Sequence, residues 1–269
     1  MDMIAFIGGG NMASAIIGGL VKSGRAADSI VVVDPGTAQR DKLHGELGVR
    51  TLAAADATLA PASTVVWAVK PQLFNAAAAP CAAFVANALQ LSVMAGIRSD
   101  AIVRATGAAR VVRTMPNTPA LVGQGMTGLF ARDAVSPADR AGVEAVLAPT
   151  GRLLWVARED DLDAVTALSG SGPAYVFYFV EAMMEAAEQM GLSAEQGKTL
   201  ALATFAGATS LAQASPDTPA LLRERVTSKG GTTYAALSSL EASGVKAAFI
   251  SALKAAQRRA RELGDEFGA

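Results

Sequence analysis

The stretch IAFIGGGNMASAIIGGLVK, residues 4–22, decides the fold. Residues 4–7 form a short apolar run that predicts a buried strand, and residues 11–22 have the pattern of a helix that ends at Gly24. Between them, residues 8–13 follow the pattern G-x-G-x-x-A. A strand, a glycine turn and a helix in this order are typical of a turn that binds the pyrophosphate of a dinucleotide.

The small residues of this glycine turn each have a physical role in binding or packing. Gly8 allows a tight turn, Gly10 lets the backbone approach a phosphate, and Ala13 lets the helix pack closely on the strand. The first N–H groups of a helix and its dipole also favour an anion. Glycine-rich turns are common, so a purely structural turn is the alternative. The residues predicted to bind the cofactor here are Gly8, Gly9, Gly10, Asn11, Met12 and Ala13.

The first half of the chain alternates short apolar runs with helical segments. Apolar runs between helices indicate strands that are buried on both faces of a mostly parallel sheet. We therefore expect a Rossmann-type α/β domain over residues 1–158. Strands are predicted at residues 4–7, 30–33, 64–69, 91–94, 109–115, 126–130 and 152–156, and helices at 11–22, 37–47 and 137–147.

Beyond residue 158 the pattern is helical, and no further β-rich run follows. The apolar content of these helices is high for segments that must also face water. We expect an all-α domain over residues 159–269 that carries a subunit interface, with an alanine-rich monomeric bundle as the alternative. Five helical patterns occupy residues 174–190, 193–214, 218–227, 232–242 and 245–263.

Composition excludes several classes of protein. Hydrophobic residues make up 51% of the 269 residues and charged residues 17%, so a disordered chain is excluded. The formal net charge of −1 offers no basic excess, and we expect no nucleic-acid partner. One cysteine, Cys81, and one histidine, His44, exclude a disulfide framework and the common cysteine or two-histidine metal sites. We therefore expect no metal.

No segment predicts export or a membrane span. The first residues lack the basic start of a signal peptide. The longest uncharged helical stretch, residues 199–216, contains several polar side chains and reads as a buried helix. We expect a cytoplasmic protein that has no membrane partner.

Two charged residues after the second predicted strand bear on the choice of cofactor. Asp34 lies 24 residues beyond Gly10, where an acidic residue is expected to bind the ribose 2′-hydroxyl of NAD. Asp34 could instead cap the next helix. Arg40 on that helix could pair with the 2′-phosphate of NADP. The two residues favour different cofactors. The alternative for both is that they are ordinary charged residues of a turn and of a helix face, with no role in binding.

Five further segments follow the glycine turn in order. They are AVKPQ at 68–72, RTMPNTPA at 113–120, GMTGL at 125–129, SGSGPAYVF at 169–177 and VTSKGGTTYAALSSLE at 226–241. Together with the turn, they resemble the pyrroline-5-carboxylate reductase family, and the last segment is the most specific. Lys229 departs from the family pattern, because many members carry proline at that position.

The resemblance implies a Rossmann domain followed by an all-helical dimerisation domain, in a homodimer or a decamer built from dimers. It implies the reduction of 1-pyrroline-5-carboxylate to L-proline by NAD(P)H, the final step of proline biosynthesis. NADPH is the expected cofactor and NADH the alternative. In this family the active site lies where the cofactor meets helices of the dimerised domains.

Loops at the carboxyl ends of the predicted strands are expected to line the cofactor. Lys70 could contact cofactor oxygens, and a solvated loop lysine is the alternative. Asn117 could bond the nicotinamide-side ribose or the carboxamide, and a turn residue is the alternative. The cofactor residues expected in these loops are Ala68, Val69, Lys70, Pro71, Met94, Ala95, Gly96 and Asn117.

Two segments of small residues, 169–173 and 230–233, look like helix starts whose free N–H groups attract a carboxylate. By resemblance, Thr233 hydrogen-bonds the substrate carboxylate, while helix capping is the alternative for Thr232 and Thr233. The imine either arrives protonated or receives its proton through Ser171 or a water, and the sequence does not decide between these alternatives. The expected substrate-binding residues are Ser171, Gly172, Gly230, Gly231, Thr232 and Thr233, with Ser171 and Thr233 as the catalytic pair.

Two other functions compete with this reading. A 3-hydroxyacid or 6-phosphogluconate-type dehydrogenase also joins a Rossmann domain to helices, but its acid–base chemistry usually needs a lysine on the first interdomain helix. Residues 174–190 contain glutamates and no lysine. A non-enzymatic dinucleotide sensor would not need two helix starts that attract anions.

Overall fold

The structure is a computed structural model that describes residues 2–267. These residues form two compact units. The first unit contains the described residues up to Ser171 together with those from Ala256 onward. The second unit is Gly172–Ala255.

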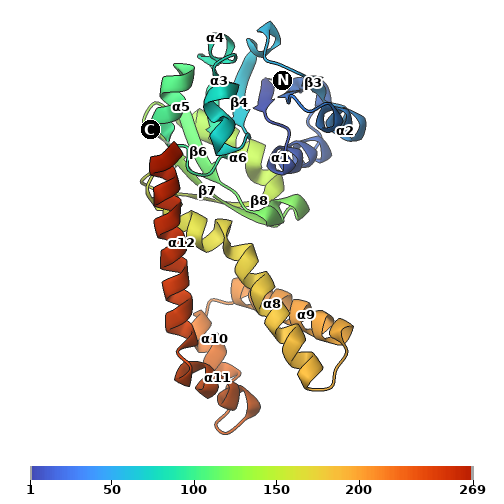
Figure 1. The fold of residues 1–269 in the computed structure, drawn as a ribbon, viewed down its shortest axis with the longest axis vertical. Coiled ribbons are helices and arrows are strands. Elements are labelled where there is room, and N and C mark those ends of the chain that lie inside the picture. Colours follow the sequence, from blue (N-terminus) through green and yellow to red (C-terminus); the bar gives the residue numbers. More distant parts are fainter. Residues whose placement is uncertain (1, 268–269) are drawn as a thin grey trace. The chain divides into compact units, whose positions relative to one another are not determined.

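An eight-stranded sheet forms the centre of the first unit (Figure 1). The strand order is β3-β2-β1-β4-β5-β6-β7-β8. Neighbouring strands are parallel except for β6 and β7. The order reverses between β1 and β4, which is where Rossmann-type sheets bind ligands. The strands are β1 Met3–Ile7, β2 Ile30–Val33, β3 Arg50–Leu52, β4 Ala62–Trp67, β5 Leu89–Ser92, β6 Val111–Met115, β7 Gly125–Ala131 and β8 Gly151–Trp155.

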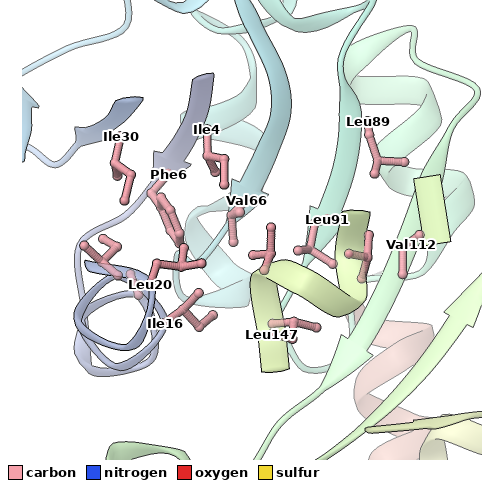
Figure 2. Packing of buried hydrophobic residues seen from close by; sticks show 14 of the residues in the cluster. Ile4, Phe6, Ile16, Leu20, Ile30, Val66, Leu89, Leu91, Val112 and Leu147 are labelled. Carbon is pink, nitrogen blue, oxygen red and sulfur yellow. The ribbon is translucent and has the colours of Figure 1, made fainter. Parts of the chain in front are cut away.

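Apolar side chains on both faces of the strands explain why helices cover both faces of the sheet. In β1, Phe6 belongs to one core layer and Ile7 to the other. Figure 2 shows the first layer, in which Ile16 and Leu147 from helices lie near Phe6 and Leu91 from strands. The first layer is covered by α1 Asn11–Lys22, α2 Thr37–Leu47 and α6 Pro137–Leu147, and the second by α3 Phe74–Ala78, α4 Ala82–Val85 and α5 Ser99–Thr106.

Helices alone make up the described part of the second unit. Its first two helices pack against each other as a pair (Figure 1). The five helices predicted beyond residue 158 are confirmed. None of the described helices combines the length and the apolarity that crossing a lipid bilayer requires. The helices are α8 Gly172–Gln189, α9 Ala194–Ala214, α10 Pro219–Arg225, α11 Thr232–Ala242 and α12 Val245–Phe267, of which α12 continues into the first unit.

The compact units do not coincide with the predicted bounds, 1–158 and 159–269. A short helix, α7 (Asp161–Val165), packs on β6 and β7 of the sheet. The end of α12 also packs with the first unit, because the Arg98 guanidinium lies against Gly264 and bridges Asp160 and Asp265 at 3.0 Å each. The second unit is therefore inserted between two segments of the first.

Candidate active site

The glycine turn joins β1 to α1 at the carboxyl edge of the sheet. Gly8 has φ +94°, and a Cβ there would lie 2.7 Å from the carbonyl oxygen of Ala68, so only glycine fits. Its N–H donates to the Val33 carbonyl at 2.8 Å, which ties the turn to β2. Gly10 has an ordinary φ of −63°, and a Cβ there would meet nothing within 4 Å. Gly10 therefore leaves room for a ligand, whereas Gly8 is required by the fold.

The start of α1 fits the pyrophosphate of a dinucleotide. Gly10 is the N-cap, no side chain caps the helix, and its first turn has no acidic residue. The first N–H groups of α1 therefore have no partner within the helix and can bind phosphate oxygens. Asn11 is exposed there, whereas Ala13 is buried against the sheet. The structure thus brings the six predicted residues together in a cradle of the right chemistry.

Asp34 and Arg40 lie at the carboxyl end of β2. The Asp34 carboxylate accepts the N–H of Gly9 through Oδ2 and the N–H of Gly36 through Oδ1, both at 2.8 Å. Asp34 does not cap α2, because Gly36 occupies the N-cap position and no side chain caps that helix. Arg40 Nη1 donates to the carbonyl oxygens of Asp34 and Pro35 at 2.8 Å each. The guanidinium is thereby held beside the chain that follows β2.

Two further predicted loops leave the sheet at its carboxyl edge. The N–H of Ala68 donates to the Ile7 carbonyl at 2.8 Å, which places the loop of residues 68–71 beside the glycine turn. The Lys70 side chain is exposed and makes no hydrogen bond or ion pair with the described residues, while the Lys70 carbonyl accepts the N–H of Leu73 at 2.9 Å. In the next loop, Gly96 has φ +75°, and a Cβ there would lie 3.2 Å from the carbonyl oxygen of Leu263 in α12. Helix α12 therefore covers this loop, which contains Met94, Ala95 and Gly96.

The segment 169–173 is not a free helix start, and that part of the prediction is wrong. Helix α7 continues into a π-helical turn, η6 (Thr166–Gly170), and α8 follows from Gly172. The N–H of Ser171 donates to the Thr166 carbonyl at 2.8 Å, so it is not free for an anion. Small residues followed by proline resemble a helix start, but here they lie inside a longer helical path. Such π turns occur often at functional sites.

Asn117 fastens this π turn to the sheet. Its Nδ2 donates to the carbonyl oxygen of Ser169 at 3.1 Å and to the hydroxyl of Ser169 at 3.3 Å. Its Oδ1 accepts the N–H of Met126 in β7 at 2.9 Å. Pro173 has no N–H, so the Ser169 carbonyl lacks its usual helical partner, and Asn117 supplies one. The amide therefore has protein partners at both ends.

We expect Asn117→Ala to lower the free energy of unfolding by about 1–2 kcal/mol, because a half-buried carbonyl and a backbone N–H lose their partners. Calorimetry should show a melting temperature that is roughly 3–6 °C lower. Asn117→Asp is the matched control, because it keeps the acceptor for Met126 and loses only the donor to Ser169. An unchanged melting temperature in the alanine variant would contradict this role.

The turn before α11 forms a second helix start. Gly231 is the N-cap and no side chain caps the helix, so the capping alternative for Thr232 and Thr233 is wrong. The N–H of Gly231 donates to the Ser228 carbonyl at 3.0 Å, and Gly230 has φ +75°. The Thr233 hydroxyl makes no hydrogen bond to any described residue. The Thr233 hydroxyl and the first N–H groups of α11 therefore have no partners within the helix, whereas the Gly231 N–H is already used.

A buried polar cluster beside the sheet edge escapes the sequence analysis. The Glu159 carboxylate accepts the N–H and the hydroxyl of Ser99, both at 2.6 Å, and Arg113 Nη1 at 2.7 Å. Burial alone would raise the pKa of Glu159, but the Ser99 hydrogen bonds and the Arg113 charge bring it below its ordinary value. Glu159 and Arg113 are 46 residues apart in the chain, and no local pattern connects them.

Asp163 extends this cluster into a cavity of about 20 Å³. Burial raises the pKa of Asp163, and its Oδ2 and the Nε of Arg113 are buried without a hydrogen-bond partner among the described residues. Met94 and Gly96 also line the cavity. The cluster thus lies next to a loop expected to border the cofactor. No group of three histidine, cysteine or acidic residues in the described chain could hold a metal ion.

Comparison with known proteins gives two family matches that follow each other along the chain. Residues 3–96 match a family model described as NADP oxidoreductase coenzyme F420-dependent. Residues 159–263 match a family model described as pyrroline-5-carboxylate reductase dimerisation. The first match contains the glycine turn and the second contains the turn before α11.

Individual relatives cover nearly the whole chain. The pyrroline-5-carboxylate reductase of Pseudomonas aeruginosa is 44% identical over 267 residues, which is 98% of either chain. The solved structure of a pyrroline-5-carboxylate reductase from Coxiella burnetii has a TM-score of 0.91 at 38% identity, and the match covers 97% of this chain and 98% of that one. The enzyme of Plasmodium falciparum, solved with NADP bound, has a TM-score of 0.86 at 26% identity over 98% of both chains. The chain therefore belongs to the pyrroline-5-carboxylate reductase family.

Proposed function

We propose that this protein reduces 1-pyrroline-5-carboxylate to L-proline with NADPH, the final step of proline biosynthesis. The observation that carries the proposal is 44% identity over 98% of a curated reductase of that name. This reaction needs two anion-binding sites. The glycine turn together with the free start of α1 forms the first, and the free start of α11 forms the second.

The first unit holds the cofactor. Gly8, Gly9, Gly10, Asn11, Met12 and Ala13 bind its pyrophosphate, and Arg40 receives the 2′-phosphate. NADPH fits the guanidinium held after β2, and a relative was solved with NADP bound. When bound, the nicotinamide supplies the hydride. The loops that line it contain Ala68, Val69, Lys70, Pro71, Met94, Ala95, Gly96 and Asn117.

The turn before α11 binds the substrate carboxylate. Gly230 and Gly231 form the turn around the carboxylate, while the first N–H groups of α11 and the hydroxyls of Thr232 and Thr233 are its donors, at a helix end that attracts anions. The substrate is a cyclic imine, and its C=N carbon accepts hydride readily once the nitrogen is protonated. Holding the reactants close and aligned therefore supplies most of the catalysis.

The imine nitrogen needs one proton for each hydride that its carbon receives. We assign the relay of that proton to the Ser171 hydroxyl or to a water beside it, with Gly172 lining the same place. Ser171 is half-buried where η6 passes into α8. Its backbone N–H already donates to the Thr166 carbonyl, so the hydroxyl is the donor of Ser171 that we assign to the relay.

We propose that the helical unit forms a homodimer, with a decamer built from such dimers as the larger form. Phe177 and Tyr178 of α8 are 58% and 69% exposed, and Met190 in the turn after α8 is 75% exposed. Apolar surface of this kind marks an interaction site, and the matching family model is one of dimerisation. We also propose a functional division between residues 1–158 and 159–269, since the dimerisation model matches from residue 159. We propose a cytoplasmic location as well.

Thr233→Ala is expected to raise KM for the imine acid about tenfold, because a hydrogen bond to a charged group is lost, with little change in KM for NADPH. The rate of NADPH oxidation, followed by absorbance, gives both constants. Ser239→Ala on the same helix is the matched control. Equal damage to both KM values would contradict the role of Thr233, and the absence of turnover with either NADPH or NADH would refute the proposed function.

A further inference from the structure

The Gly9 peptide groups are held from the second βα unit rather than by the glycine turn itself. The N–H of Gly9 donates to Asp34 Oδ2 at 2.8 Å. The carbonyl oxygen of Gly9 accepts Gln39 Nε2 at 2.5 Å and the Ser14 hydroxyl at 3.2 Å. Gln39 and Asp34 are both half-buried, and Leu43 of the same helix lies beneath Gly9.

We infer that Asp34 and Gln39 are positioning residues that orient the phosphate-binding turn, and that Asp34 does this in place of selecting NAD through the ribose. The inference rests on the proposed use of a dinucleotide cofactor. Asp34 and Gln39 are called the Gly9 clamp below.

The clamp acts through the planes of two peptide groups. In a trans peptide the C=O and the following N–H point in opposite directions. By holding the Gly9 carbonyl, Gln39 therefore makes the N–H of Gly10 point the opposite way within the same peptide plane. By accepting the N–H of Gly9, Asp34 fixes the plane of the preceding peptide group. The directions of the donors that meet the pyrophosphate are thus set by Asp34, which follows β2, and by Gln39 of α2.

The clamp also resolves the opposite indications of Asp34 and Arg40. An acidic residue at the end of β2 is expected to favour NAD. Here each carboxylate oxygen of Asp34 already accepts a backbone N–H, from Gly9 and from Gly36. The negative charge is compensated by these donors, and the Arg40 guanidinium lies on the carbonyl of the same residue. A 2′-phosphate is therefore compatible with an aspartate at this position.

Direct titration of the full-length protein with NADPH and with NADH tests the clamp. Gln39→Met removes the amide donor and keeps the length of the side chain, and Asp34→Asn removes one of two acceptors. Each variant is expected to raise Kd about five- to tenfold, by the same factor for both cofactors, because the turn and not the ribose is affected. Asp41→Asn is the matched control, because it removes an exposed carboxylate from the same helix and should leave both Kd values unchanged.

A ribose ligand would give the opposite pattern. If Asp34 bound the 2′-hydroxyl, Asp34→Asn would weaken NADH alone and leave NADPH equal or tighter, which would overturn the inference. Unchanged Kd values in Gln39→Met would overturn it as well.

Hydrogen exchange of the cofactor-free protein separates the clamp from the proposed function. The Gly9 amide should be protected in the natural sequence and in Asp41→Asn, and should exchange at least about tenfold faster in Asp34→Asn. Equally fast exchange in all three proteins overturns the clamp even if the enzyme turns over. A protected Gly9 amide in a protein that reduces no imine counts against the proposed function and supports the clamp.

Discussion

Gly10→Val is expected to weaken NADPH binding about 100-fold or more while leaving the melting temperature within about 2 °C of the unmodified protein. Gly10 has φ −63°, and a Cβ there would meet nothing within 4 Å, so the folded protein tolerates a side chain. The open space is where we propose that the pyrophosphate approaches the start of α1, and a branched side chain would fill it. Titration of NADPH fluorescence and a thermal melt measure the two effects.

Two further glycine variants sharpen this test. Gly142→Val also adds a side chain to open space, on helix α6, and should leave NADPH binding unchanged. Gly8→Ala should lower the melting temperature, because φ is +94° and the new Cβ would lie 2.7 Å from the Ala68 carbonyl oxygen. If Gly10→Val bound NADPH normally, the pyrophosphate would not lie at this turn. A large loss of stability in Gly10→Val would show that the residue is needed for folding.

Glu159→Gln is expected to lower the free energy of unfolding by about 2–3 kcal/mol at pH 7. The Arg113 side chain is only 8% exposed, and removing the charge of Glu159 leaves a buried guanidinium without its counter-ion. The estimate lies below the about 3–5 kcal/mol typical of a broken buried pair, because Glu159 keeps 20% of its side-chain exposure. Urea unfolding at constant ionic strength measures the difference.

The same pair predicts a pH dependence. The pKa of Glu159 in the folded protein lies below its ordinary value of 4.5, so the carboxylate stabilises the fold above that pH. This stabilisation is lost as the pH falls through the folded pKa. The difference between the natural protein and Glu159→Gln should therefore be constant near neutrality and shrink below about pH 4.5. A constant difference down to pH 3 would show that packing, and not charge, is responsible.

The exposed pair of Arg132 and Asp100 provides the control. The Asp100 side chain is 70% exposed, so Asp100→Asn should change the free energy of unfolding by less than about 1 kcal/mol. A loss in this variant as large as that in Glu159→Gln would mean that any charge removed from this surface destabilises the protein, and the buried pair would have no special role.

Local patterns predicted the long helices and the central strands well. The predicted bounds 11–22, 37–47 and 137–147 are those of α1, α2 and α6. Their ends carry clear signals, such as Gly48 with φ +69° after α2 and the capping box of Ser136 before α6. The glycine turn is likewise local, so its residues could be found from their spacing alone.

Features that depend on distant partners could not be predicted. Strand β3 is short and lies at the sheet edge, where only one neighbour pairs with it, so it needs no apolar run. The π turn at residues 166–170 depends on Asn117, 52 residues before Ser169. The roles of Asp34 and Gln39 also require the fold, because the partner of both is Gly9 in another element. The spacing from Gly10 singled out Asp34, but it predicted the ribose 2′-hydroxyl as its partner, whereas the structure shows the N–H of Gly9.

The return of α12 to the first unit determines how this protein can be recombined with its relatives. Residues 172–255 form an internal cassette with two covalent junctions, because the chain re-enters the first unit at Ala256. A chimera joined once, at residue 158 or 171, would replace the native helix end that packs on Gly96 and Arg98. Exchange of the helical cassette should therefore keep residues 256–267 from the same parent as the nucleotide-binding sheet.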